Sequence, residues 1–256
     1  MNKLSVVIIT HNEEVNIANC IEGLSFADEV IVLDFASLDQ TADLARSLCA
    51  SVHSTKDWPG FGPQKNRALA LAHGEWVLAL DADERVDPKL AEEIRLAIAS
   101  NSYAAYEIPR LTQFCGQWIH HCGWQPDYVL RLFRRNRAKF SDDLVHERVV
   151  LAKGELLGRL SSPLLHLSYP SPTHYWQKLE RYSEAWAKQR HSQGQKASMF
   201  RAGLAGLVAF FRSYFFQLGI LDGAMGFAVC TMQAEAAFSK YFTLYYLNHK
   251  DDHARQ

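Results

Sequence analysis

Hydrophobic and polar positions follow two alternating patterns over residues 4–99. Short uncharged runs rich in β-branched residues, as expected of buried strands, alternate with segments whose apolar residues recur at helical spacing. The expected strands are Leu4–Thr10, Glu29–Leu33, Ser51–His53 and Glu75–Leu80. One expected helix begins at Asn12, and the others cover Thr41–Ala50, Gln64–Ala72 and 88–99. Strands and helices in this order predict an α/β fold with a doubly wound, mostly parallel, Rossmann-like sheet.

The chain changes character after Pro170. A polar, charged helical pattern covers His174–Gln195, and two strongly apolar and aromatic segments follow at 202–216 and 223–246. The longest uncharged run in these segments, Gly223–Ala234, is shorter than the ~20 residues of a transmembrane helix. We therefore expect a first domain over 1–170 and a helical extension over 171–256. Its apolar helices are expected to lie on a membrane surface, or to pack on the first domain or on another subunit.

Two aspartates stand one residue apart where the apolar run Trp76–Leu80 ends. On a strand alternate side chains share a face, so Asp81 and Asp83 would converge on one point. Two carboxylates held that close repel each other unless a cation lies between them, and a divalent ion that also binds phosphate oxygens would serve. The alternative is a polar strand end that caps the next helix. The motif is short, so alone it is weakly specific.

Acidic residues follow other expected strands too. Glu13, Asp34 and Asp39 stand at or just beyond strand ends, and a carboxylate there can accept hydrogen bonds from a base N–H or from sugar hydroxyls. The first strand is followed by His11, Asn12 and Glu13 instead of a G-x-G-x-x-G turn. A conventional dinucleotide-binding domain is therefore excluded.

Composition narrows the possibilities further. The 256 residues carry a net charge of −1, which gives no global indication of nucleic-acid binding. Five scattered cysteines argue against a disulfide framework and fit a reducing compartment, and the first residues carry no signal-peptide pattern. Cys115 and Cys122 enclose two histidines, but their spacing is not that of a structural zinc site, so an aromatic substrate-binding loop is the preferred interpretation.

The ordered combination of these motifs resembles the family 2 glycosyltransferases of GT-A fold. The resemblance covers residues 1–150 and depends on Thr10-His11-Asn12-Glu13, Asp34, Lys65 and Asp81-Ala82-Asp83. Further along, Trp124, Asp127, Arg131-Leu132-Phe133-Arg134 and His146-Glu147 are similar to the branch that adds β-1,4-linked glucose to the first inner-core heptose of lipopolysaccharide. The resemblance implies an inverting hexosyltransferase with a GT-A domain at 1–170.

The resemblance also implies roles at the donor site. It assigns donor binding to Thr10, Asn12, Glu13, Asp34, Lys65, Asp81 and Arg131, and metal binding to Asp83 together with Asp81. The implied cofactor is Mg²⁺ or Mn²⁺, which would stabilise the departing diphosphate of a UDP-hexose. Lys65 would neutralise phosphate charge, and the alternative is a solvated helix lysine.

Other residues are implied on the acceptor side. The favoured base is Glu147, with His146 orienting it and Asp142 as an alternative, and acceptor binding is assigned to Trp124, Asp127 and Arg134. Arg134 belongs to a cationic cluster, Arg131–Lys139, that would meet the anionic lipid A–core acceptor or lipid headgroups, while a solvated face and RNA binding are the alternatives.

These residues imply a cytoplasmic enzyme, peripheral on the inner face of the bacterial inner membrane, in contact with its anionic surface and not with nucleic acid. Two other functions stay open. One is transfer to a polyprenyl phosphate or another glycolipid, and the other is a catalytically silent scaffold that binds sugar nucleotides.

Overall fold

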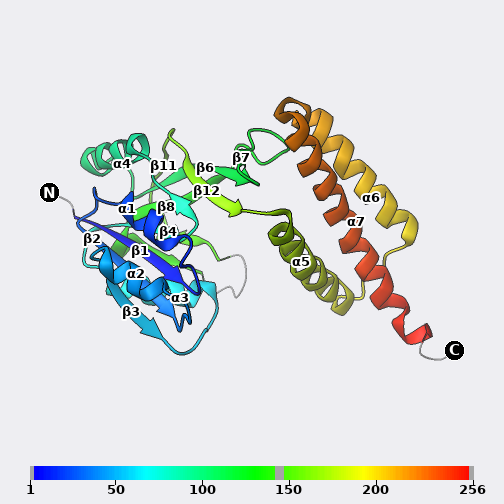
Figure 1. Ribbon diagram of the computed structural model, residues 1–256, viewed down its shortest axis with the longest axis horizontal. Coiled ribbons are helices and arrows are strands. Elements are labelled where there is room, and N and C mark those ends of the chain that lie inside the picture. Colours follow the sequence, from blue (N-terminus) through cyan, green and yellow to red (C-terminus); the bar gives the residue numbers. More distant parts are fainter. Residues whose placement is uncertain (1–2, 142–146, 254–256) are drawn as a thin grey trace. The chain divides into compact units, whose positions relative to one another are not determined.

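The computed structural model describes residues 3–141 and 147–253 (Figure 1). The chain forms two compact units. The first contains Met1–Arg110 and Asp127–His166, and the second contains Leu111–Pro126 and Leu167–Gln256. A single boundary at residue 170 therefore misses the excursion of 111–126 into the second unit.

The first unit is built on a mostly parallel sheet whose strands run in the order β3-β2-β1-β4-β8-β6. These strands are β1 (Leu4–Thr10), β2 (Glu29–Phe35), β3 (Ser51–Thr55), β4 (Trp76–Asp81), β6 (Ala105–Phe114) and β8 (Tyr128–Arg134). Strands β1 to β4 are parallel, whereas β8 lies antiparallel to both β4 and β6. The smaller strands are β5 (Glu84–Arg85), β9 (Ala138–Phe140), β10 (Val149–Leu151), β11 (Leu157–Arg159) and β12 (Leu164–Tyr169).

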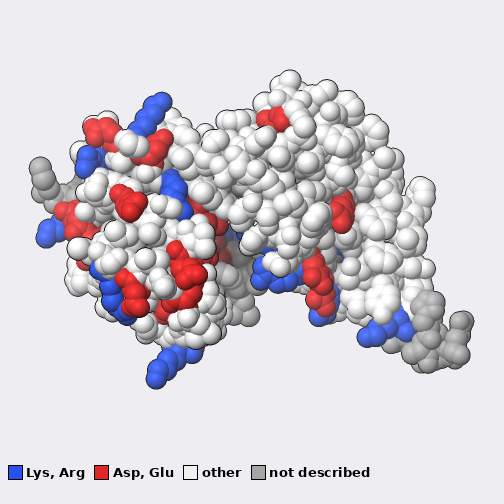
Figure 2. Space-filling view, in the orientation of Figure 1, with Lys and Arg blue, Asp and Glu red and all other residues white. Residues whose placement is uncertain are grey.

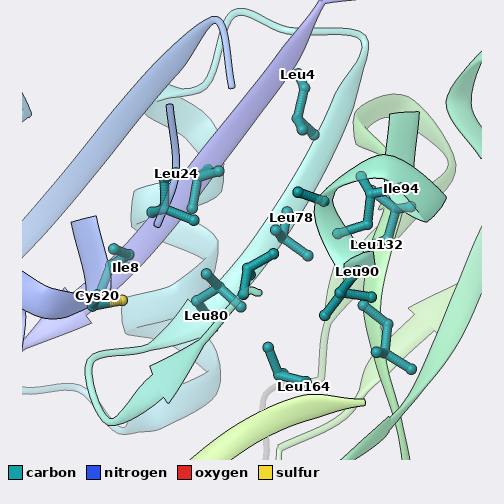
Figure 3. Close-up of a cluster of buried hydrophobic side chains, with 14 of the residues drawn as sticks. Leu4, Ile8, Cys20, Leu24, Leu78, Leu80, Leu90, Ile94, Leu132 and Leu164 are labelled. Carbon is teal, nitrogen blue, oxygen red and sulfur yellow. The ribbon is translucent and has the colours of Figure 1, made fainter. Parts of the chain in front are cut away.

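Both faces of this sheet are buried, as a doubly wound fold requires. Alternate residues of β1 enter different cores: Val6 and Ile8 pack on one face and Val7 on the other. The helices are α1 (Ile17–Glu22), α2 (Thr41–Ser47), α3 (Phe61–Leu71) and α4 (Pro88–Ser100). Helices α1, α2 and α4 contribute to the first core, where Leu78 and Leu80 meet Leu90 and Ile94 of α4 (Figure 3), and α3 contributes to the second.

The predicted strands and helices of residues 4–99 are all present, with shifted ends. Helix α1 begins at Ile17 instead of Asn12, because Asn12 has a positive φ of 54° that a helix cannot contain. Helix α3 begins at Phe61, inside the expected loop. The start of α4 is confirmed: the Asp87 side chain accepts a hydrogen bond from the Leu90 N–H at 2.7 Å, and proline occupies the first turn.

The second unit is mainly helical. Its elements include β7 (Gln117–Trp118), α5 (Pro172–Ser192), α6 (Met199–Phe211), the π-helical η2 (Arg212–Phe216), η3 (Gly219–Asp222) and α7 (Gly223–His253). Its core joins Phe114 and Cys122 to Tyr175 of α5 and Val229 of α7. Within the described residues no helix alone combines the length and apolarity of a membrane span, but the pair Met199–Phe216 and Gly219–Lys250, bent by 74°, meets both criteria together.

Candidate active site

Side chains named in the sequence gather at the carboxyl edge of the parallel strands. Thr10 of β1 stands beside Asp34 of β2, and Ile9 stands beside Asp81 of β4. Open α/β sheets bind ligands at this edge, because the strand ends and their loops leave polar groups there that the sheet does not use. The expected grouping of Thr10, Asp34 and Asp81 follows directly from the strand register.

Asp81 lies between two cations. Its carboxylate contacts Lys65 of α3, with 2.9 Å between Nζ and Oδ1, and the Nη2 atom of Arg131 on β8. Burial opposes ionisation of Asp81, but the charges of Arg131 and Lys65 outweigh it and hold the pKa of this carboxyl well below its ordinary value. Lys65 is buried, so the interpretation of a solvated helix lysine is wrong.

The same lysine reaches the favoured base. Lys65 Nζ lies 2.8 Å from Oε1 of Glu147, so one ammonium group joins Glu147 to Asp81. Glu147 lies far from Asp81 in the sequence, yet in the fold the carboxylates of both residues contact Lys65. The other two catalytic candidates, Asp142 and His146, lie outside the described residues.

Glu84 is a central residue that sequence reasoning missed. Its carboxylate is fully buried, lies 2.7 Å from Nη2 of Arg131, and accepts the backbone N–H of Asp81 at 3.0 Å. Arg110 approaches the same carboxylate at 3.7 Å. Glu84 thus fixes both the guanidinium and the strand end. In the sequence Glu84 is visible only as a third acid directly after Asp81-Ala82-Asp83. That pattern is equally typical of an exposed residue before a helix, so it did not identify Glu84 as buried.

Asp83 belongs to a different part of the edge. Strand β4 ends at Asp81, and Asp83 lies in a turn, so strand alternation does not apply and the two aspartates have different neighbours. The carboxylate of Asp83 lies 3.3 Å from Nε2 of His166 on β12. Antiparallel pairing of β12 with β5 sets His166 opposite Glu84, which explains the approach. His166, in an ordinary strand pattern, gave no sequence signal.

Asp83 and His166 are the residues that could hold a divalent metal. Among the described residues no group of three or more His, Cys, Asp or Glu side chains is arranged to hold an ion. Mg²⁺ and ions like it need few protein ligands in phosphate-binding sites, where substrate oxygens and water complete the shell. One carboxylate and one imidazole fit that requirement. Asp81 fits it poorly, because its two oxygens already face Lys65 and Arg131.

The loops after β1 and β2 hold each other in place. The carboxylate of Asp34 accepts hydrogen bonds from the Thr10 hydroxyl at 3.0 Å and from the Ser37 N–H at 3.0 Å. Asn12 accepts the Leu38 N–H at 2.9 Å. The backbone N–H of Glu13 donates to the Thr41 hydroxyl at 2.7 Å. One connected pair of strand ends and loops therefore contains all four residues predicted here to bind the sugar-nucleotide donor: Thr10, Asn12, Glu13 and Asp34.

An exposed row of aromatic rings continues from these loops, and sequence reasoning missed it. His11 lies 5.1 Å from Phe35, Phe35 lies 5.3 Å from Trp58, and Trp58 lies 4.9 Å from Phe61, measured between ring centroids. Trp58 and Phe61 are both partly open to solvent. An exposed aromatic ring beside hydrogen-bonding carboxylates suits the stacking of a nucleobase.

The predicted acceptor residues have different partners. Asp127 pairs with Arg110, with 2.8 Å between Nη2 and Oδ2. Trp124 belongs to the second unit, where it packs against Phe114 and Tyr169. Its ring is partly buried against this aromatic cluster, and acceptor binding by Trp124 stays a prediction.

Arg134 lies at the wrong end of the sheet for an acceptor site. It stands opposite Trp76, at the amino end of β4, where it contacts the Glu75 carboxylate and lies 5.2 Å from the Trp76 ring. Five residues of strand separate Trp76 from Asp81, which is about 16 Å. In the same cluster Arg137 pairs with Glu155 at 3.0 Å. Only Arg131 of this cluster is shown to meet the carboxylate edge.

The comparisons with known proteins decide the family. Residues 5–149 match the model of glycosyl transferase family 2, which covers the strand-end carboxylates, Lys65, Arg131 and Glu147. The chain belongs to glycosyl transferase family 2. It is a nucleotide-sugar glycosyltransferase, and the resemblance seen in its sequence is confirmed.

Relatives of this glycosyltransferase extend the match beyond the family region. An uncharacterised glycosyltransferase of Rickettsia typhi is 32% identical over 249 residues, which cover 93% of this chain and 85% of the relative. The lipopolysaccharide core biosynthesis glycosyltransferase LpsC of Rhizobium meliloti is 29% identical over 223 residues, covering 83% and 80%. Among solved structures, residues 1–349 of S. aureus TarS match with a TM-score of 0.50, at 14% identity, over 97% of this chain and 92% of that one. The expected GT-A type of fold is thereby confirmed.

Proposed function

We propose that this glycosyltransferase transfers a hexose, glucose from UDP-glucose, to a heptose of the lipopolysaccharide inner core with inversion at the anomeric carbon. The observation that carries the proposal is the cluster in which Lys65 joins Asp81 to Glu147 beside Arg131. It combines cations for a diphosphate with a carboxylate for an attacking hydroxyl. The relationship to LpsC, named for lipopolysaccharide core biosynthesis, supports the acceptor class.

The donor side of the reaction needs groups that bind a diphosphate as it leaves. Arg131 is buried, and its Nε–H has no hydrogen-bond partner among the described residues, so it retains a donor for a phosphate oxygen. Lys65 adds a second positive charge. A Mg²⁺ or Mn²⁺ ion held by Asp83 and His166 would supply further neutralisation of the leaving group. Thr10, Asn12, Glu13 and Asp34 would position the nucleoside.

The acceptor side needs one base. The acceptor oxygen forms a bond to the anomeric carbon, the bond from that carbon to the phosphate oxygen breaks, and the hydroxyl proton passes to Glu147. A positioned carboxylate in this role contributes on the order of 10²–10⁴-fold to the rate. Because the base and the leaving group lie on opposite faces of the sugar in such a displacement, the product has inverted configuration.

A transfer assay with purified protein tests the proposal. The donors are UDP-glucose and other UDP-hexoses, each with Mg²⁺ or Mn²⁺, and the acceptors are a heptose-terminated lipopolysaccharide core and a polyprenyl phosphate. We expect glucose to enter the heptose-terminated core. Transfer only to polyprenyl phosphate would contradict the heptose acceptor and favour a polyprenyl phosphate or another glycolipid as acceptor. Tight binding of the donor without any transfer would favour the catalytically silent scaffold.

The Glu147→Gln variant tests the assigned base. It should lose about 10²-fold or more in transfer while still binding UDP-glucose, because the amide cannot take the proton. Glu155→Gln is the matched control, since Glu155 pairs with Arg137 in the same unit and should leave transfer unchanged. We also propose that the enzyme works in the cytoplasm at the inner face of the bacterial inner membrane, where a lipid-linked core would be available.

A further inference from the structure

Helix α6 carries its large apolar side chains on the outside. Six residues at helical spacing form an exposed row that we name the apolar stripe: Phe200, Leu204, Leu207, Val208, Phe211 and Phe215. The row continues into the bend before α7 with Phe216, which is 85% exposed, and Leu218. Isolated exposed leucines are ordinary, but a continuous stripe of this length on a helix indicates a surface that contacts something else.

Apart from Phe210 and Tyr214, which are partly buried against the core of the unit, the inner face of α6 and η2 is made of small residues. Ala202, Gly206 and Ser213 are buried against the rest of the unit. The approach to α7 is so close that a Cβ atom on Gly206 would lie 3.1 Å from the backbone oxygen of Ala234. A helix on a water-soluble surface turns its large apolar residues inward. Small residues inside and large apolar residues outside are the arrangement of helices surrounded by lipid.

The exposed charges of the segment that carries the stripe are basic. Between residues 199 and 222 the charged side chains are Arg201, Arg212 and Asp222. Both arginines are exposed, whereas the Asp222 side chain is nearly buried and lies 2.8 Å from Nδ1 of His121. Figure 2 shows the surface over α6 almost entirely uncharged. The two exposed charged residues of this segment are arginines, which suit anionic headgroups.

We propose that the apolar stripe and the bend after it are a membrane-docking surface that lies in the interface of an anionic phospholipid bilayer. The bend of 74° between the two helical segments fits this position, because it lets both segments enter the bilayer at one end without crossing it. The proposed role of this surface, holding the enzyme beside a lipid-linked acceptor, rests on the proposed function. Lipid binding itself depends only on the stripe.

Vesicle flotation of the full chain tests the proposal, with no donor or acceptor present. Vesicles of phosphatidylethanolamine with phosphatidylglycerol supply an anionic surface, and vesicles of phosphatidylcholine supply a neutral one. We expect the protein to float with the anionic vesicles and to bind the neutral ones at least about tenfold more weakly. Failure to float with anionic vesicles would overturn the proposal, and equal binding to both would overturn its anionic part.

A triple variant, Leu204→Gln, Leu207→Gln and Phe211→Gln, tests the stripe. It should bind anionic vesicles at least about tenfold more weakly, because three apolar side chains no longer enter the bilayer. The control is Leu96→Gln, an equally exposed apolar residue on α4, which should float like the wild type. Unchanged flotation of the triple variant would overturn the assignment of the surface.

Two further measurements distinguish lipid docking from self-association and from a role in the chemistry. Light scattering reports the oligomeric state, and a change from dimer to monomer in the triple variant would make the stripe an interface between copies of this chain instead. Donor hydrolysis without lipid should be the same in wild type and triple variant, because no stripe residue belongs to the proposed site. A protein that floats but transfers no sugar would refute the proposed function and leave the docking surface in place.

Discussion

The carboxylate edge of the first unit and the outer face of α6 depart from the usual distribution of residues in opposite ways. At the edge, charged side chains are buried: Glu84, Arg131 and Lys65 are nearly inaccessible to water. On α6, large apolar side chains are exposed along the length of the helix. Soluble proteins ordinarily bury the second class and expose the first.

The two departures are stabilised differently. Each buried charge at the edge has an opposite charge within contact distance, as with Lys65 between Asp81 and Glu147. The stripe on α6 is open to solvent, and the proposed bilayer would cover it. Buried charges are therefore expected to be sensitive to single substitutions, whereas the stripe should tolerate them until lipid is present. Substitutions in each region test this contrast.

Asp83→Asn should have the largest effect. An amide binds a divalent ion more weakly than a carboxylate, so we expect transfer to fall by about 10³-fold while the free energy of unfolding changes by less than about 1 kcal/mol. Transfer assays across Mn²⁺ concentrations and urea unfolding give the two values. Calorimetric Mn²⁺ binding in the presence of UDP supplies a readout that does not depend on turnover.

Asp43→Asn is the control for that substitution, since the Asp43 side chain is 85% exposed and pairs only with Arg46 among its described salt-bridge partners. It should transfer and bind Mn²⁺ like the wild type. Full Mn²⁺ affinity in the Asp83→Asn variant would remove this residue from the metal site.

Glu84→Gln should destabilise the fold strongly. The substitution removes the negative charge opposite Arg131 in a fully buried position and leaves the guanidinium partly uncompensated, which typically costs about 3 kcal/mol. Urea unfolding measures the loss. The matched control is Glu75→Gln at the other end of β4, where an exposed pair with Arg134 should contribute less than about 1 kcal/mol. Equal losses would contradict the proposed difference between the two ends of the strand.

Lys65→Met should impair both chemistry and stability, because it removes a buried cation between two carboxylates. The substitution leaves Asp81 and Glu147 without the ammonium between them, so transfer should fall by about 10²-fold. Because Lys65 helps to keep the pKa of Asp81 low, its loss raises that pKa, and the acid limb of the pH–rate profile should move to higher pH. Lys89→Met, an exposed lysine on α4, is the control. A variant with an unmoved acid limb would show that Arg131 alone holds Asp81 ionised.

The sequence predicted the parallel half of the fold well. Strands such as Leu4–Thr10 are uncharged, β-branched and bounded by polar residues, so their type and order are locally encoded. The strands after residue 100 were not predicted. Strand β6 contains Pro109, and β8 contains Arg131 and Arg134, so neither shows a clean period. Their positions are set by the pairing of β8 with β4 and of β6 with β8, which is information that a local pattern does not contain.

The candidate site was predictable where it depends on strand ends and not where it depends on long-range pairing. Parallel register alone brings Thr10, Asp34 and Asp81 to one edge. The contact of Asp83 with His166 depends on pairing between β5 and β12, which lie far apart in the chain. Trp124 and Arg134 were chosen by motif, and a motif does not say which unit or which end of a strand a residue occupies.

Two glycines of α6 provide the smallest effect and separate its two faces. A Cβ atom added at Gly203 would meet open space, so Gly203→Ala should stabilise the helix by about 0.5–1 kcal/mol. A Cβ on Gly206 would instead lie 3.1 Å from the Ala234 oxygen and 3.3 Å from the Phe238 Cβ. That crowding should outweigh the helix gain and make Gly206→Ala destabilising by about 1 kcal/mol. Urea unfolding of the two variants measures the difference. Equal stabilisation by both substitutions would show that α6 does not pack closely on α7 through its small residues. It would then contradict the arrangement of small residues inside and large apolar residues outside on this helix.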